Sequence, residues 1–107
     1  MEAQQIYAEL NCPGFFTDAG YWTGVPVRDI LAKAGVSEDA AAVAFIALGD
    51  SYRQQLPLDL AQEDGFLIAY KFNDKIFPPV HGYPLRLVAK GEPGSTWVKW
   101  LGELRVD

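Results

Sequence analysis

The residues best suited to chemistry lie in two apolar segments near the C-terminal end of the sequence. The first segment, residues 81–88, holds the single histidine, His81, and five residues later Arg86. The second segment, residues 98–101, carries Lys99. An imidazole changes its charge near neutral pH, Arg makes forked contacts with phosphate, and Lys makes a point contact. The spacing therefore predicts a pocket for a phosphorylated ligand, built on two adjacent extended segments.

Each of these residues also has a plainer interpretation. His81 precedes Gly82 in a proline-flanked loop, where it can donate to a ligand that the glycine lets approach, or simply bond a neighbouring carbonyl. With no second His or Cys nearby in the sequence, we do not expect His81 to bind a metal. Arg86 and Lys99 can be solvated strand residues, or Arg86 can pair with a carboxylate such as Asp50.

The only cysteine, Cys12, is the other reactive candidate. It ends a strand-like segment just before a Pro-Gly turn, a position suited to a thiolate metal ligand or a nucleophile at the mouth of a pocket. The alternative is a small buried hydrophobe, which is what free cysteines most often are. A thiol-based redox protein is a third hypothesis, but it needs a cation near the thiolate, and none lies close to Cys12 in the sequence.

The composition predicts one folded domain and argues against several classes of protein. The chain has 107 residues, half of them hydrophobic, so we expect a single domain over residues 1–107. A net charge of −5 argues against nucleic acid as a partner. Residues 1–64 carry ten acids and three bases, whereas residues 65–107 carry four acids and six bases, which favours the C-terminal part for any anion site. There is no apolar run long enough to span a membrane, and the polar start does not have the pattern of a signal peptide.

The hydrophobic pattern indicates which elements position these residues. We expect a half-buried strand over residues 6–12, a turn and loop through residue 20, and a lead-in at 22–26 to a helix that Gly35 ends. Further strands are predicted at 42–48, 52–56, 66–72, 85–89 and 98–106, with a short helix at 57–62 and a hairpin turn at 73–75. The expected fold class is therefore a mixed, strand-rich α+β domain with short helices and long loops.

The aromatic residues have an expected place in this pattern. Trp22, Trp97 and Trp100 are interpreted as core or pocket-wall side chains. Because side chains alternate along a strand, Trp100 is expected to share one face of residues 98–106 with Leu104, and Lys99 to lie on the other.

Seven short blocks of sequence, in a specific order and spacing, cover almost the whole chain. They are residues 12–14, 22–27 with 30–31 and 34–35, 50–52, 56–58, 67–70 with 73, 81–88, and 98–101. Together they resemble the molybdopterin-binding domain of the sulfite oxidase family. One departure is Lys90-Gly91, where the family usually has proline-glycine.

The resemblance implies a role for each candidate residue. Cys12 matches the cysteine whose thiolate ligates molybdenum, and a soft sulfur suits that metal. His81 and Arg86 match residues that hold the pterin and its phosphate, and Lys99 matches a lysine that does the same. The implied cofactor is molybdenum–molybdopterin, which performs oxygen-atom or electron transfer while the protein supplies the ligand, the orientation and the charge.

The resemblance also sets what we expect of the whole protein. The expected function is a molybdopterin-binding oxidoreductase domain, and the alternative is a non-catalytic binding or interaction module that keeps the fold but has lost the cofactor. The family's substrate-side tyrosine and an upstream segment with further pterin contacts have no counterpart, so we expect a minimal version or a fragment of the cofactor domain. The implied partners are a small oxidisable or reducible substrate and an electron-transfer partner or second chain that completes the pocket. A bacterial or archaeal source is expected, and family habit favours an exported or periplasmic protein.

Overall fold

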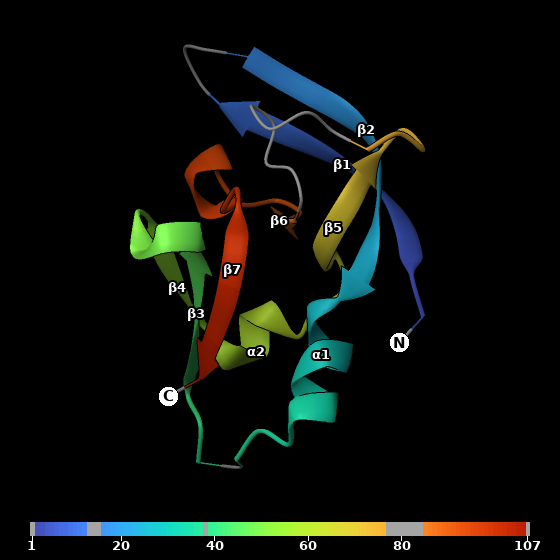
Figure 1. Cartoon of the computed structure of the whole chain (residues 1–107). Helices are drawn as coiled ribbons and strands as arrows, with labels where there is room; N and C mark the ends of the chain where they lie inside the picture. Colours follow the sequence, from blue (N-terminus) through green and yellow to red (C-terminus); the bar gives the residue numbers. More distant parts are fainter. Residues whose placement is uncertain (1, 13–15, 38, 77–84, 107) are drawn as a thin grey trace.

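The chain folds into two antiparallel sheets that share one hydrophobic core, with two helices at one end of the molecule (Figure 1). The computed structural model describes residues 2–12, 16–37, 39–76 and 85–106, and the side chains of all of these except residues 11, 12 and 16–18. One sheet has the strand order β1-β2-β5-β6, and the other has the order β4-β3-β7. This arrangement confirms the predicted strand-rich α+β class.

The two sheets take their strands from different parts of the sequence. The four-stranded sheet consists of β1 (Gln4–Cys12), β2 (Phe16–Pro26), β5 (Phe66–Phe72) and β6 (Arg86–Ala89). The three-stranded sheet consists of β3 (Ala42–Ala47), β4 (Arg53–Pro57) and β7 (Leu101–Val106). Both faces of the core are therefore built from segments far apart in the chain.

Strand β2 is the largest difference from the sequence prediction, which placed a loop through residue 20 and a lead-in to the helix after it. Residues 16–24 of β2 instead pair with β1. Phe16 lies opposite Cys12 at one end of this pairing, and Gly24 lies opposite Gln4 at the other. The first part of β2 has a weak intrinsic strand propensity, and its backbone pairing with β1 stabilises the strand. A side chain at Gly20 would approach the Asn73 side chain to 2.6 Å, so the glycine here permits close packing rather than a loop.

The two helices confirm their predictions. Helix α1 (Val27–Ala34) buries Val27 and Leu31 and ends at Gly35, whose φ of 74° is the left-handed conformation that glycine adopts at low cost. Helix α2 (Leu58–Ala61) packs against β3 and β4. No helix in the described part of the chain is long and apolar enough to cross a membrane.

The core is continuous between the two sheets. Strand β3 lies in the middle of its sheet, and five of its six residues are buried. All four residues of β6 are buried as well. The largest fully buried side chains come from both sheets and from the segments that join them: Leu10, Leu31, Phe45, Leu67, Leu87 and Trp97. The predicted turn after β5 is also confirmed, with Asn73 and Asp74 at φ 50° and 65°, the left-handed backbone of a tight hairpin turn.

The last predicted strand starts later than expected. Strand β7 begins at Leu101, and the three residues before it are not in a strand. Trp100 has a φ of 52°, which breaks the alternation of side chains that a strand imposes. The expectation that Trp100 shares a face with Leu104 is therefore wrong.

Candidate functional site

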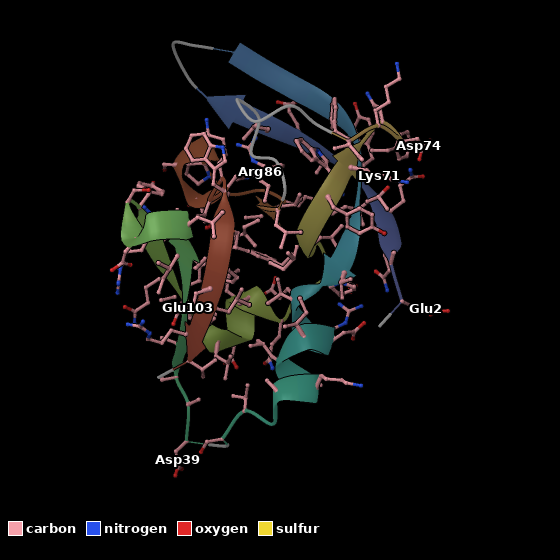
Figure 2. All side chains as sticks on the ribbon, in the orientation of Figure 1. Glu2, Asp39, Lys71, Asp74, Arg86 and Glu103 are labelled. Atoms are coloured by element: carbon pink, nitrogen blue, oxygen red, sulfur yellow. The ribbon has the colours of Figure 1, made fainter. Side chains whose placement is uncertain are left out.

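The first residue of β6, Arg86, is a buried cation. Only 3% of its surface is exposed, although it carries a guanidinium that water solvates strongly. A solvated strand residue was one interpretation of the sequence, and for Arg86 that interpretation is wrong. Figure 2 shows the side chain directed into the upper half of the molecule, among the ends of the surrounding strands.

Trp22 of β2 provides an aromatic surface for this guanidinium. The Arg86 Cζ atom lies 5.8 Å from the centroid of the Trp22 ring, within the range of a cation–π contact. Trp22 is itself 2% exposed, and its indole N–H donates to the carbonyl of Ala8 in β1 at 3.2 Å. The position of the ring is thus tied to the backbone of β1.

Two more aromatic side chains surround Trp22. Phe72, at the end of β5, lies 4.4 Å from Trp22 between ring centroids, and Trp97 lies 5.4 Å away on an edge-to-face approach. The indole N–H of Trp97 donates to the carbonyl of Glu92 at 3.1 Å. We call Trp22, Phe72 and Trp97 the aromatic cluster. The cluster connects β2 and β5 to the segment that precedes β7. Arg86 lies against the Trp22 ring of this cluster.

Backbone hydrogen bonds bring the Arg86 and Lys99 segments together. The N–H of Leu87 donates to the carbonyl of Val98 at 2.9 Å, and the N–H of Leu101 donates to the carbonyl of Leu85 at 2.9 Å. These two bonds bracket Arg86 on one segment and Lys99 on the other. The two predicted cations therefore lie on adjacent, hydrogen-bonded segments, but the segment of Lys99 is not the extended strand that the sequence predicted.

Lys99 is partly buried and lies beside its neighbour in the sequence. Its Nζ atom is 4.8 Å from the centroid of the Trp100 ring, a second cation–π contact. Trp100 is 39% exposed, so its ring forms part of the surface rather than the core. Each of the two cations thus lies against a tryptophan.

The other two predicted site residues are described in less detail. Cys12 is the last residue of β1 and pairs with Phe16 across the hairpin, but its side chain lies outside the described part of the structure. His81 also lies outside the described residues. Strand β1 contacts the short 3-10 turn η3 (Gly94–Thr96), which precedes Lys99 by a few residues. The strand that ends at Cys12 is therefore next to the connection that carries Lys99.

Asp50 was considered in the sequence as a partner for Arg86. In the structure its carboxylate forms an ion pair with Arg53 at 3.0 Å, with side chains that are 67% and 50% exposed. An exposed pair of this kind contributes little to stability.

Two described cavities lie elsewhere in the molecule. Two open cavities of about 410 and 310 Å³ flank residues 35–37 after α1. Asp39, which lines the larger one, is at the opposite end of the molecule from Arg86 in Figure 2. No Lys or Arg lines either cavity, so neither suits an anionic ligand.

The described residues fit a pterin that carries phosphate. An anionic group needs cations held at fixed positions, and here one guanidinium and one ammonium are carried by adjacent, hydrogen-bonded segments. The sequence identified both cations but assigned Trp22 and Trp100 only a general role as core or wall residues. No spacing rule connects Trp22 with Arg86, because they lie on non-adjacent strands of the sheet.

Comparisons with known proteins show the family of the chain. Residues 3–107 match the family model described as the oxidoreductase molybdopterin-binding domain. The mitochondrial sulfite oxidase of Macaca fascicularis is 40% identical over 95 residues, covering 80% of this chain and 17% of that protein. The NADH nitrate reductase of Volvox carteri is 33% identical over 103 residues, covering 84% of this chain and 12% of that protein.

A solved structure has the same fold. The sulfane dehydrogenase SoxCD of Paracoccus pantotrophus superimposes with a TM-score of 0.90 and 24% sequence identity, over 99% of this chain and 32% of that chain. The fold and the family match define a molybdopterin-binding domain of an oxidoreductase. The chain belongs to the oxidoreductase molybdopterin-binding domain family, as a sulfite oxidase-like member, and the cofactor of this family is molybdenum–molybdopterin.

Two earlier expectations are not decided by these comparisons. The relatives include eukaryotic proteins, so a bacterial or archaeal source stays a prediction. The chain spans only 17% of the length of the sulfite oxidases that it matches, so the activity, substrate and partners of a whole enzyme belong to the proposal below.

Proposed function

We propose that this chain is the cofactor-holding domain of a molybdenum oxidoreductase that acts on a small substrate such as sulfite or an S- or N-oxide. The observation that carries the proposal is the buried guanidinium of Arg86, which lies 5.8 Å from the centroid of the Trp22 ring and beside the segment of Lys99. A guanidinium makes forked, charge-assisted hydrogen bonds with phosphate, and the ammonium on the neighbouring segment adds a point contact.

In this proposal the residues of the chain have separate tasks. Arg86 and Lys99 bind the phosphate of the pterin, His81 holds the pterin itself, and Cys12 supplies the thiolate ligand to the metal. When bound, the cofactor supplies oxygen-atom or electron transfer at molybdenum. Because Trp22 and Trp97 of the aromatic cluster are buried and Phe72 is partly buried, the cluster limits the access of water to the stem of Arg86 and fixes the direction of its guanidinium.

The proposal includes a partner and a location. A large cofactor is usually enclosed by protein on several sides. A second chain or a further part of a longer protein would therefore supply the surfaces of the pocket that this domain does not form. The relatives' much greater length supports this view. An electron-transfer partner and an exported location complete the proposal.

The variant Cys12→Ser tests the division of tasks. We expect it to lose turnover of sulfite or of an S-oxide while keeping most of its pterin, because the phosphate contacts at Arg86 and Lys99 do not depend on the thiolate. Turnover is measured by a redox-dye assay, and pterin by its fluorescence after oxidation and release. Cys12→Ser protein with full turnover would contradict the role of the thiolate.

No described residue and no comparison favours the non-catalytic alternative, so it is not proposed here as a second function. Turnover by the unaltered, cofactor-loaded protein distinguishes the two, because a pure binding module shows no turnover even with an intact Cys12.

A further inference from the structure

The segment between η3 and β7 departs from regular strand geometry at one residue, Trp100. Its φ of 52° is the left-handed region, which non-glycine residues with bulky side chains rarely adopt. Such strain persists only where the surrounding structure imposes it, and it is concentrated at functional sites. At Trp100 the surroundings are clear: the Leu48 N–H donates to its carbonyl at 2.6 Å, and the next N–H, of Leu101, donates to Leu85.

Trp100 is much less buried than the other two tryptophans of the chain. The residue is 39% exposed, whereas Trp22 and Trp97 are each 2% exposed. Glycine or asparagine would adopt the left-handed backbone with less strain. A large aromatic residue at a strained and exposed position therefore calls for a role that its ring performs.

The ring contacts the side chain of the preceding residue. In a regular strand, adjacent residues point to opposite faces, so Lys99 could not lie over the ring of Trp100. The left-handed turn at Trp100 removes this restriction, and the Lys99 Nζ atom lies 4.8 Å from the ring centroid. The left-handed backbone at Trp100 thus permits the cation–π contact between its ring and Lys99.

We propose that Trp100 is a positioning residue: its ring holds the ammonium of Lys99 at the place where the phosphate of the cofactor binds. This inference rests on the proposed function, because it assigns Trp100 a role through the phosphate contact of Lys99. A lysine has four rotatable bonds and loses much freedom when it binds. The ring reduces that loss in advance.

The first measurement uses cofactor-free protein and tests the geometry alone. A side chain that lies over an indole ring shows upfield NMR shifts of its methylene protons. We expect such shifts for Lys99, their loss in Trp100→Asn, and their retention in Trp100→Phe. Asparagine is the matched control because it tolerates the left-handed backbone but has no ring. Lys99 resonances at ordinary positions in the unaltered protein would overturn the proposal.

The second measurement uses protein loaded in a cofactor-competent host and follows the rate at which pterin is released. We expect Trp100→Asn to release pterin about two to five times faster, the effect of losing one cation–π contact near the surface. Trp100→Phe is expected to restore most of the difference. In a Lys99→Met background, Trp100→Asn is expected to cause no further change, because the ring acts through the lysine.

The outcomes separate this inference from the function on which it rests. If Lys99→Met releases pterin no faster than the unaltered protein, the phosphate contact of the proposed function is wrong. If Lys99→Met does release pterin faster but Trp100→Asn does not, only the role of Trp100 is wrong. An equal effect of Trp100→Asn with and without Lys99 would also overturn it, because the ring would then act independently of the ammonium.

Discussion

Arg86 is a buried residue to which the proposed function assigns a role in binding rather than in stability. Its guanidinium is removed from water and lies against the ring of Trp22. Removing one partner of a buried charged pair typically costs about 3–5 kcal/mol. If Arg86 serves mainly cofactor binding, its replacement is expected to reduce pterin content far more than it reduces stability.

The variant Arg86→Met tests this expectation. We expect its pterin content after expression in a cofactor-competent host to fall severalfold, while the cofactor-free variant still unfolds cooperatively and loses less than about 3 kcal/mol of stability. Thermal unfolding followed by circular dichroism and pterin fluorescence provide the two readouts. Protein that is strongly destabilised, by more than about 3 kcal/mol as when one partner of a buried pair is removed, would show that Arg86 is mainly structural.

At the scale of elements, β2 must approach β5 closely for Trp22 to reach Arg86. The register between these strands shifts between Thr23 and Gly24. A Cβ atom at Gly24 would overlap the carbonyl oxygen of Ile68 and lie 2.6 Å from the Cα atom of Ala69. Both atoms are backbone of β5, so they cannot move aside without separating the strands.

Gly24→Ala and Gly102→Ala form a matched pair that tests this contact. A Cβ atom at Gly102 meets the side chain of Leu48 at 2.7 Å, but that side chain is more than half exposed and can turn away. We expect Gly24→Ala to destabilise the protein by about 1–3 kcal/mol, the usual cost of overpacking, and Gly102→Ala by clearly less. The measurement is the free energy of unfolding in urea, and equal values for the two variants would contradict the account.

The elements also show which parts of the fold the sequence can predict. Strand β5 occupies the same residues, 66–72, as predicted, because an apolar run between turn residues has few alternatives. Helix α1 was predicted from its apolar face and from Gly35. The first half of β2 was missed because its strand character comes from pairing with β1, which lies outside any local window.

The candidate site was predictable to a similar extent. The two cations and their adjacent segments follow from residue types and spacing, and the family resemblance gave Cys12 and His81 their expected roles. The partners of the cations did not follow, since Trp22 reaches Arg86 from another strand and Trp100 reaches Lys99 only through a left-handed backbone. A local rule that assumes regular strands fails at the residue where function imposes strain.

At the scale of the whole molecule, two sheets and a shared core carry the residues of the proposed cofactor site. The chain has a net charge of −5, yet the basic residues are concentrated in its last 43 positions, which include Arg86 and Lys99. The family match extends over residues 3–107 and so includes all the elements that carry the proposed site. The central claim is that this domain binds molybdenum–molybdopterin through those residues.

The most direct test is the molybdenum and pterin content of the purified chain from a cofactor-competent host, measured beside a matched Arg86→Met, Lys99→Met double variant. Molybdenum is measured by plasma mass spectrometry, and pterin by fluorescence after oxidation. The account predicts close to one equivalent of each in the unaltered protein and a large loss of both in the folded double variant. Folded, unaltered protein that contains neither molybdenum nor pterin would contradict it, as would a double variant that is fully loaded.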